Sequence, residues 1–390
     1  METNFCAPVG QPAVGLRVGF LFHPNIYLTK KPFMTTTTLL EEAKKVVWSA
    51  MAALPGNTVK HATATSAAPA LAAYFDPQCD WHTFHPINEL HGTAEIETGF
   101  WGPLLHAMPD MERRIHLFYG GEFDGRFVGG AGTWVTSHGY LTGTFTNDWL
   151  GIPATGKQLY VRIGEFYRVK DGRIVEARVL LDLVDVMRQA GFAVLPPSNG
   201  LDLLVPGPQY NDGVLLQPAI DAQTATSWVI LEKLFSGLGR FDKSNLQSMP
   251  MHACWHPEMM WYGPCGIGTA RRVEGFQKHH QAPFLKAFPD RSGSGKGVGH
   301  VARIAEGHYV ASTGWPSVGA THLGDYLGVS ATGKPINMRV ADWWRREGDV
   351  FRENWVLIDI PELLLQMGVD LFARMHEQIA NAPHNQAPRP

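Results

Sequence analysis

The chain has 390 residues, of which 45% are hydrophobic and 18% charged, and its formal net charge is −3. Two domains are expected because this length exceeds that of one ordinary hydrophobic core. The near-neutral charge provides no basic surface and argues against nucleic acid as a partner. No run of ~20 apolar residues is present that could span a membrane, so no membrane partner is expected either.

The cysteines and histidines indicate neither a disulfide framework nor a metal site. The four cysteines include no C-x-x-C pair and are few for a chain of this size, which points to a reducing cytoplasm. No histidine pair shows the H-x-x-x-H or H-E-x-x-H spacing of zinc sites on a predicted helix. The sequence therefore predicts a cytoplasmic protein without a bound metal.

The first part of the chain is expected to begin with helices. Residues 1–34 are interpreted as an N-terminal arm. Apolar residues at helical spacing predict helices over residues 35–54, 66–75 and 95–106. From residue 114 to 183, β-segments alternate with turn signals, and a short closing helix ends at Gly191.

The second part of the chain repeats this order. Residues 196–221 are rich in Pro, Gly and Asn, and we interpret them as a linker that follows a surface. Helices are then predicted over residues 227–238 and 273–288, and further β-segments follow. The Pro-rich residues 379–390 are expected to form a frayed C-terminal tail.

An internal repeat relates the two parts. Residues 148–191 align without a gap to residues 325–368, at a constant offset of 177. DWLGIPATGK matches DYLGVSATGK, and Asp182 falls on Asp359. A register that holds across two turns indicates a duplication rather than shared composition.

The repeated sequence resembles the SnoaL-like polyketide cyclases. The resemblance rests on G-x-x-A-T-G-K, an extended strand, D-G-R-I-V-E and an Asp before the closing helix, and in the second repeat also on WYGPCGIGTARRVEGF and AFPD. It implies the nuclear-transport-factor-2-like α+β fold, in which a curved antiparallel sheet and about three helices form a cone. We therefore expect two tandem cones, at residues 35–195 and 222–378, packed through their sheets as an internal pseudo-dimer. Two such chains could also pair as a homodimer.

The resemblance also implies a function. The interior of such a cone is an apolar cavity, in which a buried acid can act as a general acid or base near neutral pH. We expect chemistry of the cyclase or isomerase type, without a cofactor, on a hydrophobic small molecule of polyketide or steroid type. Two alternatives stay open: a non-catalytic ligand-binding protein, and an epoxide hydrolase or dehydratase. An epoxide hydrolase would need Asp342, Arg339 and Asp359 to converge.

Four acids are candidate catalytic residues. Asp182 and Asp359 stand before the closing helices, near the position of the general acid/base of the cyclases, although an Asp there also suits a helix N-cap. Glu165 and Asp342 lie in the middle of predicted strands, between aromatic residues. They would line the cavity if that strand face points inward, or pair with arginines if it points outward.

Six aromatic side chains are candidates for the wall of a pocket. They are His82, Trp261, Tyr262, Trp315, Trp343 and Trp355. The family often has a Glu-His-Trp triplet on its last long strand, where this chain reads Glu353-Asn354-Trp355 and Glu176-Ala177-Arg178. The second repeat is richer in aromatic residues and is the better candidate for a pocket, unless these residues form a hydrophobic interface between the domains.

Overall fold

The computed structural model describes residues 36–54, 66–126, 129–217, 219–242, 245–249, 251–293 and 298–381. The predicted N-terminal arm and most of the predicted C-terminal tail lie outside the described residues. The chain divides into two compact units, and the unit that carries every element named below begins at Thr36. In the stretches that the structure describes, no helix is long and apolar enough to cross a membrane.

The first repeat consists of helices, a sheet and a closing helix. Its elements are α1 (Thr36–Ala53), α2 (Ala68–Tyr74), β1 (Phe75–Thr83), β2 (Glu89–His91), α3 (Gly92–Ile96), η1 (Glu97–Trp101), α4 (Gly102–Ala107), β3 (Glu112–Phe123), β4 (Gly132–Thr144), β5 (Gln158–Lys170), β6 (Arg173–Leu181) and α5 (Leu183–Gln189). The stripe of α1 that faces the core has helical spacing: Ala43, Val47, Ala50 and Met51 are buried. The three predicted helices are present, but β1 and β2 precede the third one, so the helices do not all come before the strands.

The second repeat has the same order of elements. They are α6 (Asp221–Leu238), η2 (Leu246–Ser248), η3 (Met251–Ala253), β7 (Trp255–Tyr262), β8 (Thr269–Arg271), α7 (Arg272–Phe276), η4 (Gln277–Gln281), α8 (Ala282–Ala287), β9 (His300–Glu306), β10 (Tyr309–Thr321), β11 (Pro335–Glu347), β12 (Val350–Ile358), α9 (Ile360–Met367) and α10 (Leu371–Ala380). The sequence analysis did not predict α10, which begins at an N-cap formed by Asp370.

The two sheets share one topology. Their strand orders are β2-β1-β6-β5-β4-β3 and β8-β7-β12-β11-β10-β9, so each position in one sheet has a counterpart in the other. The predicted α+β class and the duplication are confirmed. Each sheet has one parallel pair, β1 with β6 and β7 with β12, among otherwise antiparallel pairs. A long connection joins these two strands, and only such a connection allows parallel pairing.

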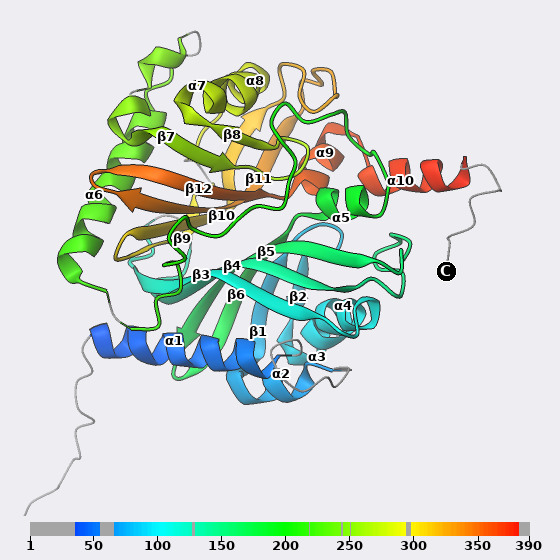
Figure 1. Cartoon of the computed structure of the whole chain (residues 1–390), viewed down its shortest axis with the longest axis vertical. Helices are drawn as coiled ribbons and strands as arrows, with labels where there is room; N and C mark the ends of the chain where they lie inside the picture. Colours follow the sequence, from blue (N-terminus) through cyan, green and yellow to red (C-terminus); the bar gives the residue numbers. More distant parts are fainter. Residues whose placement is uncertain are drawn as a thin grey trace, which may run out of the picture. The chain divides into compact units, whose positions relative to one another are not determined.

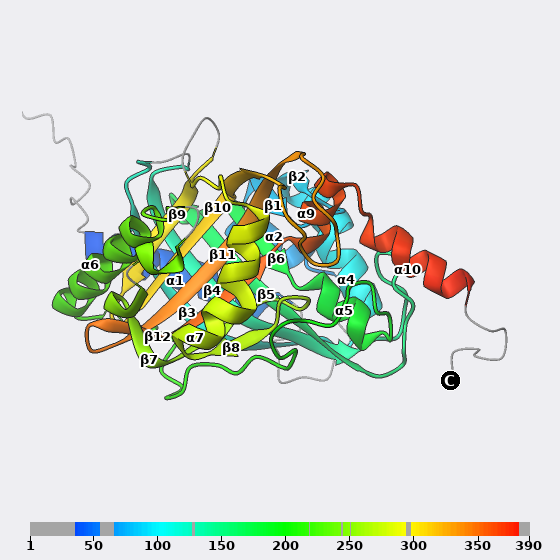
Figure 2. The same ribbon diagram turned by 90° about the horizontal axis from the view of Figure 1, so that it is seen from above.

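Helices form the outer layers and sheets the inner ones. In Figure 1, α1 to α4 lie on one side of the first sheet, α7 and α8 lie on the far side of the second, and the sheets face each other. Figure 2 shows the second sheet lying over the first, and Figure 1 shows the closing helices α5 and α9 next to each other, where they are in contact. Each sheet therefore has one face toward its own helices and one toward the other repeat.

Trp343 of β11 packs tightly on the first sheet. Its ring nitrogen donates a hydrogen bond to Thr136 Oγ1 at 2.7 Å. A Cβ atom on Gly164 would lie 2.1 Å from the Trp343 ring, so only glycine allows this approach. The contact joins the two sheets through fully buried side chains.

Two arginines related by the repeat make equivalent contacts between the halves. Arg162 donates from Nη1 to the carbonyl of Gly263 at 3.0 Å. Arg339 donates from Nη1 to the carbonyl of Thr83 at 3.2 Å. Each arginine therefore binds the end of the first strand of the opposite repeat, as in the interface of a symmetric dimer.

The predicted linker lies along both repeats. Leu201 forms a β-bridge with Thr269 of the second repeat, and Val214 forms one with Phe118 of the first. The carbonyl of Pro206 accepts a hydrogen bond from the Trp355 ring at 2.9 Å. These backbone contacts fix the linker on the surface of the joined sheets.

Candidate active site

A long helix of the second repeat contains a π-helical segment. The segment η4 joins α7 to α8 with helical backbone angles on both sides, so the three form one continuous helix. The first repeat has the same arrangement at η1. Such segments occur frequently at functional sites because they turn side chains out of the regular helical stripe. In the second repeat this segment carries His280 and Gln281.

A cavity of about 560 Å³ lies between this helix, α6 and the sheet of the second repeat. Strand alternation sets its sheet wall: Met338, Val340, Asp342 and Trp344 from β11, and Asn354, Val356 and Ile358 from β12. The volume falls within the range that holds a small organic ligand. Most of the wall is aliphatic or aromatic.

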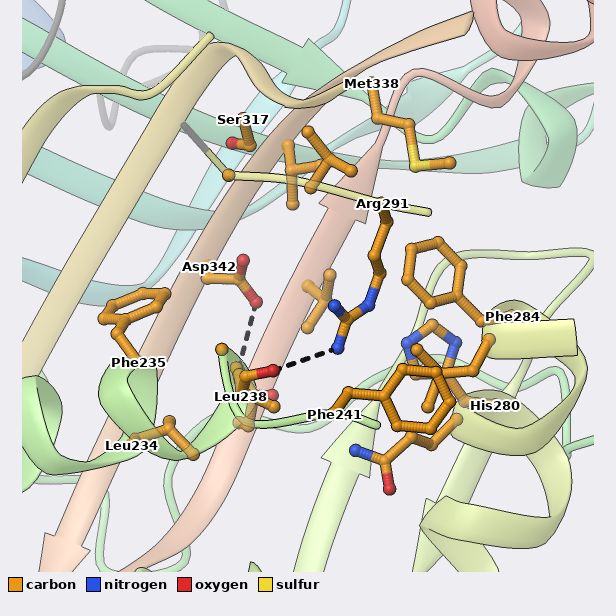
Figure 3. A pocket seen from close by; sticks show the side chains of 18 of the residues that line it. Leu234, Phe235, Leu238, Phe241, His280, Phe284, Arg291, Ser317, Met338 and Asp342 are labelled. Atoms are coloured by element: carbon orange, nitrogen blue, oxygen red, sulfur yellow. Dashed lines mark hydrogen bonds between the residues drawn. The ribbon is translucent and has the colours of Figure 1, made fainter. Parts of the chain in front are cut away.

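Asp342 is the acid in the middle of this wall. Figure 3 shows its carboxylate pointing into the cavity. Its one hydrogen bond from a side chain comes from Asn354 Nδ2 at 3.5 Å. Burial raises the pKa of Asp342 to about 7, against the smaller opposing effect of the Asn354 hydrogen bond. Within the described residues no cation forms an ion pair with it.

The equivalent acid of the first repeat is Glu165, and it is fully paired. Glu165 is completely buried and accepts hydrogen bonds from Arg113 at 2.6 Å and from the Tyr167 hydroxyl at 2.8 Å. The repeat offset places Trp344 where the first repeat has Tyr167. Among the described residues the Trp344 ring nitrogen has no hydrogen-bond partner, so it does not take the place of the Tyr167 hydroxyl.

The arginine partner of the first repeat has no counterpart in the second. Arg113 follows the residue of β3 that pairs with Thr142. At the equivalent place, Gly293 follows the residue that bridges Gly319. A glycine thus stands where the first repeat has Arg113, which leaves Asp342 without a cation and opens space beside it.

The interior of the first repeat is filled by aromatic side chains. Trp81 packs on Phe100 at 5.0 Å between ring centroids, and Trp101 packs on both. Trp81 and Trp101 are fully buried. In the second repeat, His280 replaces Phe100 and Gln281 replaces Trp101. These smaller, polar side chains account for the open volume there.

Several polar atoms around the second cavity have no partner among the described residues. They are His280 Nδ1, Gln281 Oε1, Trp255 Nε1 and Trp344 Nε1. His280 stacks on Trp261 at 4.2 Å, and burial lowers its pKa to about 3, so the ring is neutral. Buried polar groups normally find a partner, so these atoms indicate places for a ligand or water.

Asp182 and Asp359 lie at the contact between the repeats. Each forms the N-cap of its closing helix. Asp182 also accepts a hydrogen bond from the backbone N–H of Cys265 at 2.8 Å, and Asp359 accepts one from His85 at 2.9 Å. Burial raises the pKa of Asp182 to about 7 and that of Asp359 to about 6. Both contacts cross to the opposite repeat.

Neither residue lines the large cavity. Asp182 borders a void of about 10 Å³ beside Arg162, which is smaller than a ligand needs. Asp359 is bound by Arg339 at 3.1 Å. Strand alternation turns Arg339 toward the first repeat and Asp342 toward the cavity. The three residues that an epoxide hydrolase would require therefore do not converge.

One of the six aromatic candidates, Trp261, lines the cavity. Tyr262 and Trp355 stack on each other at 5.5 Å and lie at the contact between the repeats together with Trp343. Trp315 lies between two cations, with Arg178 at 5.7 Å and Arg339 at 5.6 Å from its ring centre.

His82 lies on β1, between β2 and β6 of the first sheet, and contacts Glu89 at 3.1 Å. Burial lowers the pKa of His82. This histidine therefore belongs to the repeat whose interior is filled.

Most residues of the cavity are not predictable from the sequence. The sequence does contain a signal for Asn354 as a cavity residue, because Asn354 stands where the family has the His of its Glu-His-Trp triplet. Arg291 had none: it follows α8 in a loop and enters the cavity beside Phe284 and His280 (Figure 3). In the described part of the chain, no three His, Cys, Asp or Glu side chains converge to hold a metal ion.

One family model matches part of the first repeat. Residues 62–190 match the family model of the SnoaL-like polyketide cyclases. No curated protein sequence matches the chain. Among solved structures, AclR from Streptomyces galilaeus is 24% identical, with a TM-score of 0.30, over 37% of this chain and 97% of its own.

Two further structures are similar to one repeat. IdmH from Streptomyces antibioticus is 22% identical, with a TM-score of 0.30, over 37% of this chain and 99% of its own. An NTF2-like protein from Burkholderia xenovorans LB400 is 17% identical, with a TM-score of 0.28, over 37% of this chain and 96% of its own. Residues 62–190 are thus similar to the SnoaL-like polyketide cyclases, and the second repeat has the same topology as the first.

Proposed function

We propose that the second repeat performs acid–base chemistry of the cyclase or isomerase type on a hydrophobic small molecule, without a cofactor. Asp342 is the proton acceptor and donor in this proposal. The observation that carries it is a carboxyl group with a pKa of about 7, without a cationic partner, in the wall of a cavity of about 560 Å³. Such a group can take and return a proton near neutral pH.

The surrounding groups fit this role. The neutral His280 ring and the unpartnered Trp344 N–H offer hydrogen bonds to an oxygen that becomes negative when a neighbouring proton is removed. Trp261 and Phe284 provide flat apolar walls for a ring system. The matched family is described as polyketide cyclases, and cyclisation of a polyketone starts with the loss of a proton next to a carbonyl.

A non-catalytic ligand-binding protein is the second candidate. The observation in its favour is Asn354, which stands where the family often has histidine and cannot transfer a proton. In this case Asp342 would hold the ligand by a hydrogen bond and leave it chemically unchanged.

Hydrogen exchange on a simple ketone tests the proposal. We expect the protein to accelerate deuterium incorporation next to the carbonyl of 2-tetralone in D2O, measured by NMR, and D342N to lose about 100-fold or more of this rate. D349N, which changes an exposed carboxyl in the β11–β12 turn, is the matched control and should keep the rate.

The other outcomes separate the alternatives. If D359N or D182N loses the rate and D342N keeps it, the proton is handled at the contact between the repeats and the proposal fails. If the ketone binds to the wild-type protein without faster exchange, the ligand-binding function replaces the catalytic one.

A further inference from the structure

Arg291 is a cation inside the cavity with only neutral partners. Its guanidinium donates to the carbonyl of Leu238 at 3.3 Å and to the sulfur of Met249 at 3.7 Å, and it lies 5.6 Å from the ring centre of Phe241. It is half-buried, and burial lowers its pKa. An arginine still keeps its charge under these conditions, so most of its donors lack a strong acceptor.

This cation is specific to the second repeat. Asp110 and Asp290 accept equivalent backbone hydrogen bonds from Thr144 at 2.7 Å and Thr321 at 2.9 Å, which aligns the two loops. The residue after Asp290 is Arg291, and the residue after Asp110 is a buried methionine. The arginine is therefore present beside the open cavity of the second repeat and has no counterpart at this position in the first repeat, whose interior is filled.

The two repeats arrange their charges differently. In the first, Arg113 and Glu165 neutralise each other at 2.6 Å. In the second, Arg291 and Asp342 enter the cavity from different elements, the loop after α8 and strand β11 (Figure 3). No ion pair joins them or links Arg291 to another carboxylate of the described residues. The cavity thus has an acid and a separate cation, and apolar walls complete it.

A further polar atom in the wall supports a ligand here. Gln281 is 4% exposed, and its amide nitrogen contacts the sulfurs of Met249 and Met251 at 3.9 and 3.6 Å. Its carbonyl oxygen has no partner within the described residues. A buried amide with one unused end is costly unless a ligand or water completes it.

We propose that the cavity selects an anionic ligand, a hydrophobic carboxylate, whose charged group binds Arg291 while its apolar skeleton extends toward Asp342. A guanidinium binds a carboxylate through two parallel hydrogen bonds, and the stacked aromatic walls accommodate fused rings. This inference rests on the proposed function only in placing the ligand in the same cavity. It adds a charge requirement that acid–base chemistry does not need.

A pair of matched probes tests this charge requirement. The affinities of 2-naphthoate and its neutral analogue 2-naphthamide are measured by tryptophan fluorescence at pH 7.5. We expect the wild-type protein to favour naphthoate by about 10- to 100-fold, as for a hydrogen bond to a charged group. R291M should lose this preference while its affinity for naphthamide stays within a few fold. R114M, which removes an exposed arginine of the first repeat, should keep it.

The naphthamide affinity of R291M separates misfolding from loss of the charge. The proposal is overturned if the wild-type protein binds both probes equally, or if R291M keeps the preference for naphthoate. The D342N variant distinguishes the proposed chemistry from the proposed anion site. If D342N loses ketone exchange and keeps the preference for naphthoate, both proposals stand. If the preference is present and no form exchanges the ketone, the anion site stands and the proposed chemistry fails.

Discussion

Asp342 differs from its repeat equivalent by the loss of two partners rather than by a new contact. Glu165 has an arginine and a tyrosine hydroxyl, and Asp342 has one long hydrogen bond from Asn354. An isolated carboxyl in an apolar wall is costly when ionised, so it holds its proton to a higher pH. This cost of ionisation is what distinguishes Asp342 from Glu165.

The cost of the isolated carboxyl predicts a pH-dependent stability. The pKa of Asp342 rises from about 4 in the unfolded chain to about 7 in the folded one. The unfolded chain therefore releases this proton first, and the folded state loses stability as the pH rises from 4 to 7. D342N removes the cost, so at pH 8 it should unfold with a free energy roughly 2–4 kcal/mol higher than wild type.

Urea denaturation of the wild-type protein and of D342N measures this difference in the free energy of unfolding. At pH 4 the two proteins should differ by less than about 0.5 kcal/mol, since the carboxyl is then protonated in the folded state and about half protonated in the unfolded chain. D349N should follow the wild type at every pH. If the free energy of unfolding of D342N exceeds that of wild type by the same amount at pH 4 and pH 8, the raised pKa of Asp342 is contradicted.

At the scale of elements, the helix α7-η4-α8 decides which repeat is open. His280 and Gln281 replace two large aromatic residues of the first repeat. The double variant H280F/Q281W restores those residues, so it should fill the cavity with side chains. We expect it to lose naphthamide binding at least 10-fold with an unchanged or higher melting temperature, because buried apolar area replaces a void.

A matched change in the same π segment controls this experiment. K278T also introduces the first-repeat residue, but Lys278 is exposed, so binding should stay as in wild type. If H280F/Q281W binds the probe normally, the ligand enters elsewhere.

Strand alternation sets how much of the site the sequence could predict. The fold, the repeat and an acid on β11 were readable because they rest on local periodicity and turn signals. The sequence predicts Trp343 and Trp355 as pocket residues, but Trp343 follows Asp342 directly and must face the opposite way. The loop that carries Arg291 has no periodicity, so only the folded structure brings it to the cavity.

At the scale of the whole molecule, two pairs of residues that are identical in the repeats lie at the contact between them. Arg162 and Arg339 bind the opposite repeat, and so do Asp182 and Asp359. A duplicated domain needs these residues in both copies, because each contact occurs twice around the pseudo-twofold axis. The cavity needs its residues in one copy only.

These paired contacts predict that the repeats stay associated without a covalent link. The chain can be divided between Tyr210 and Asn211, which are both exposed in the linker. The two fragments, when co-expressed, should elute together at the size of the intact chain. Adding G164L should separate them, because its side chain would occupy the space of the Trp343 ring.

G275L provides the control for this experiment, since a Cβ atom there meets no neighbouring atom within 4 Å. Fragments that elute separately without any substitution would show that the linker, rather than the paired contacts, holds the repeats together.

The π-helical segments η1 and η4 stand at equivalent places in the two repeats, and this bears on how the repeats evolved. A π turn adds one residue to a helix and rotates everything after it by about 100°. Both repeats contain it at the same place, so the insertion is older than the duplication. The simplest history is an ancestral single domain that used this turn to shape a cavity. The two copies then diverged: tryptophan and phenylalanine fill the interior of the first, and the second has an open cavity with an acid in its wall.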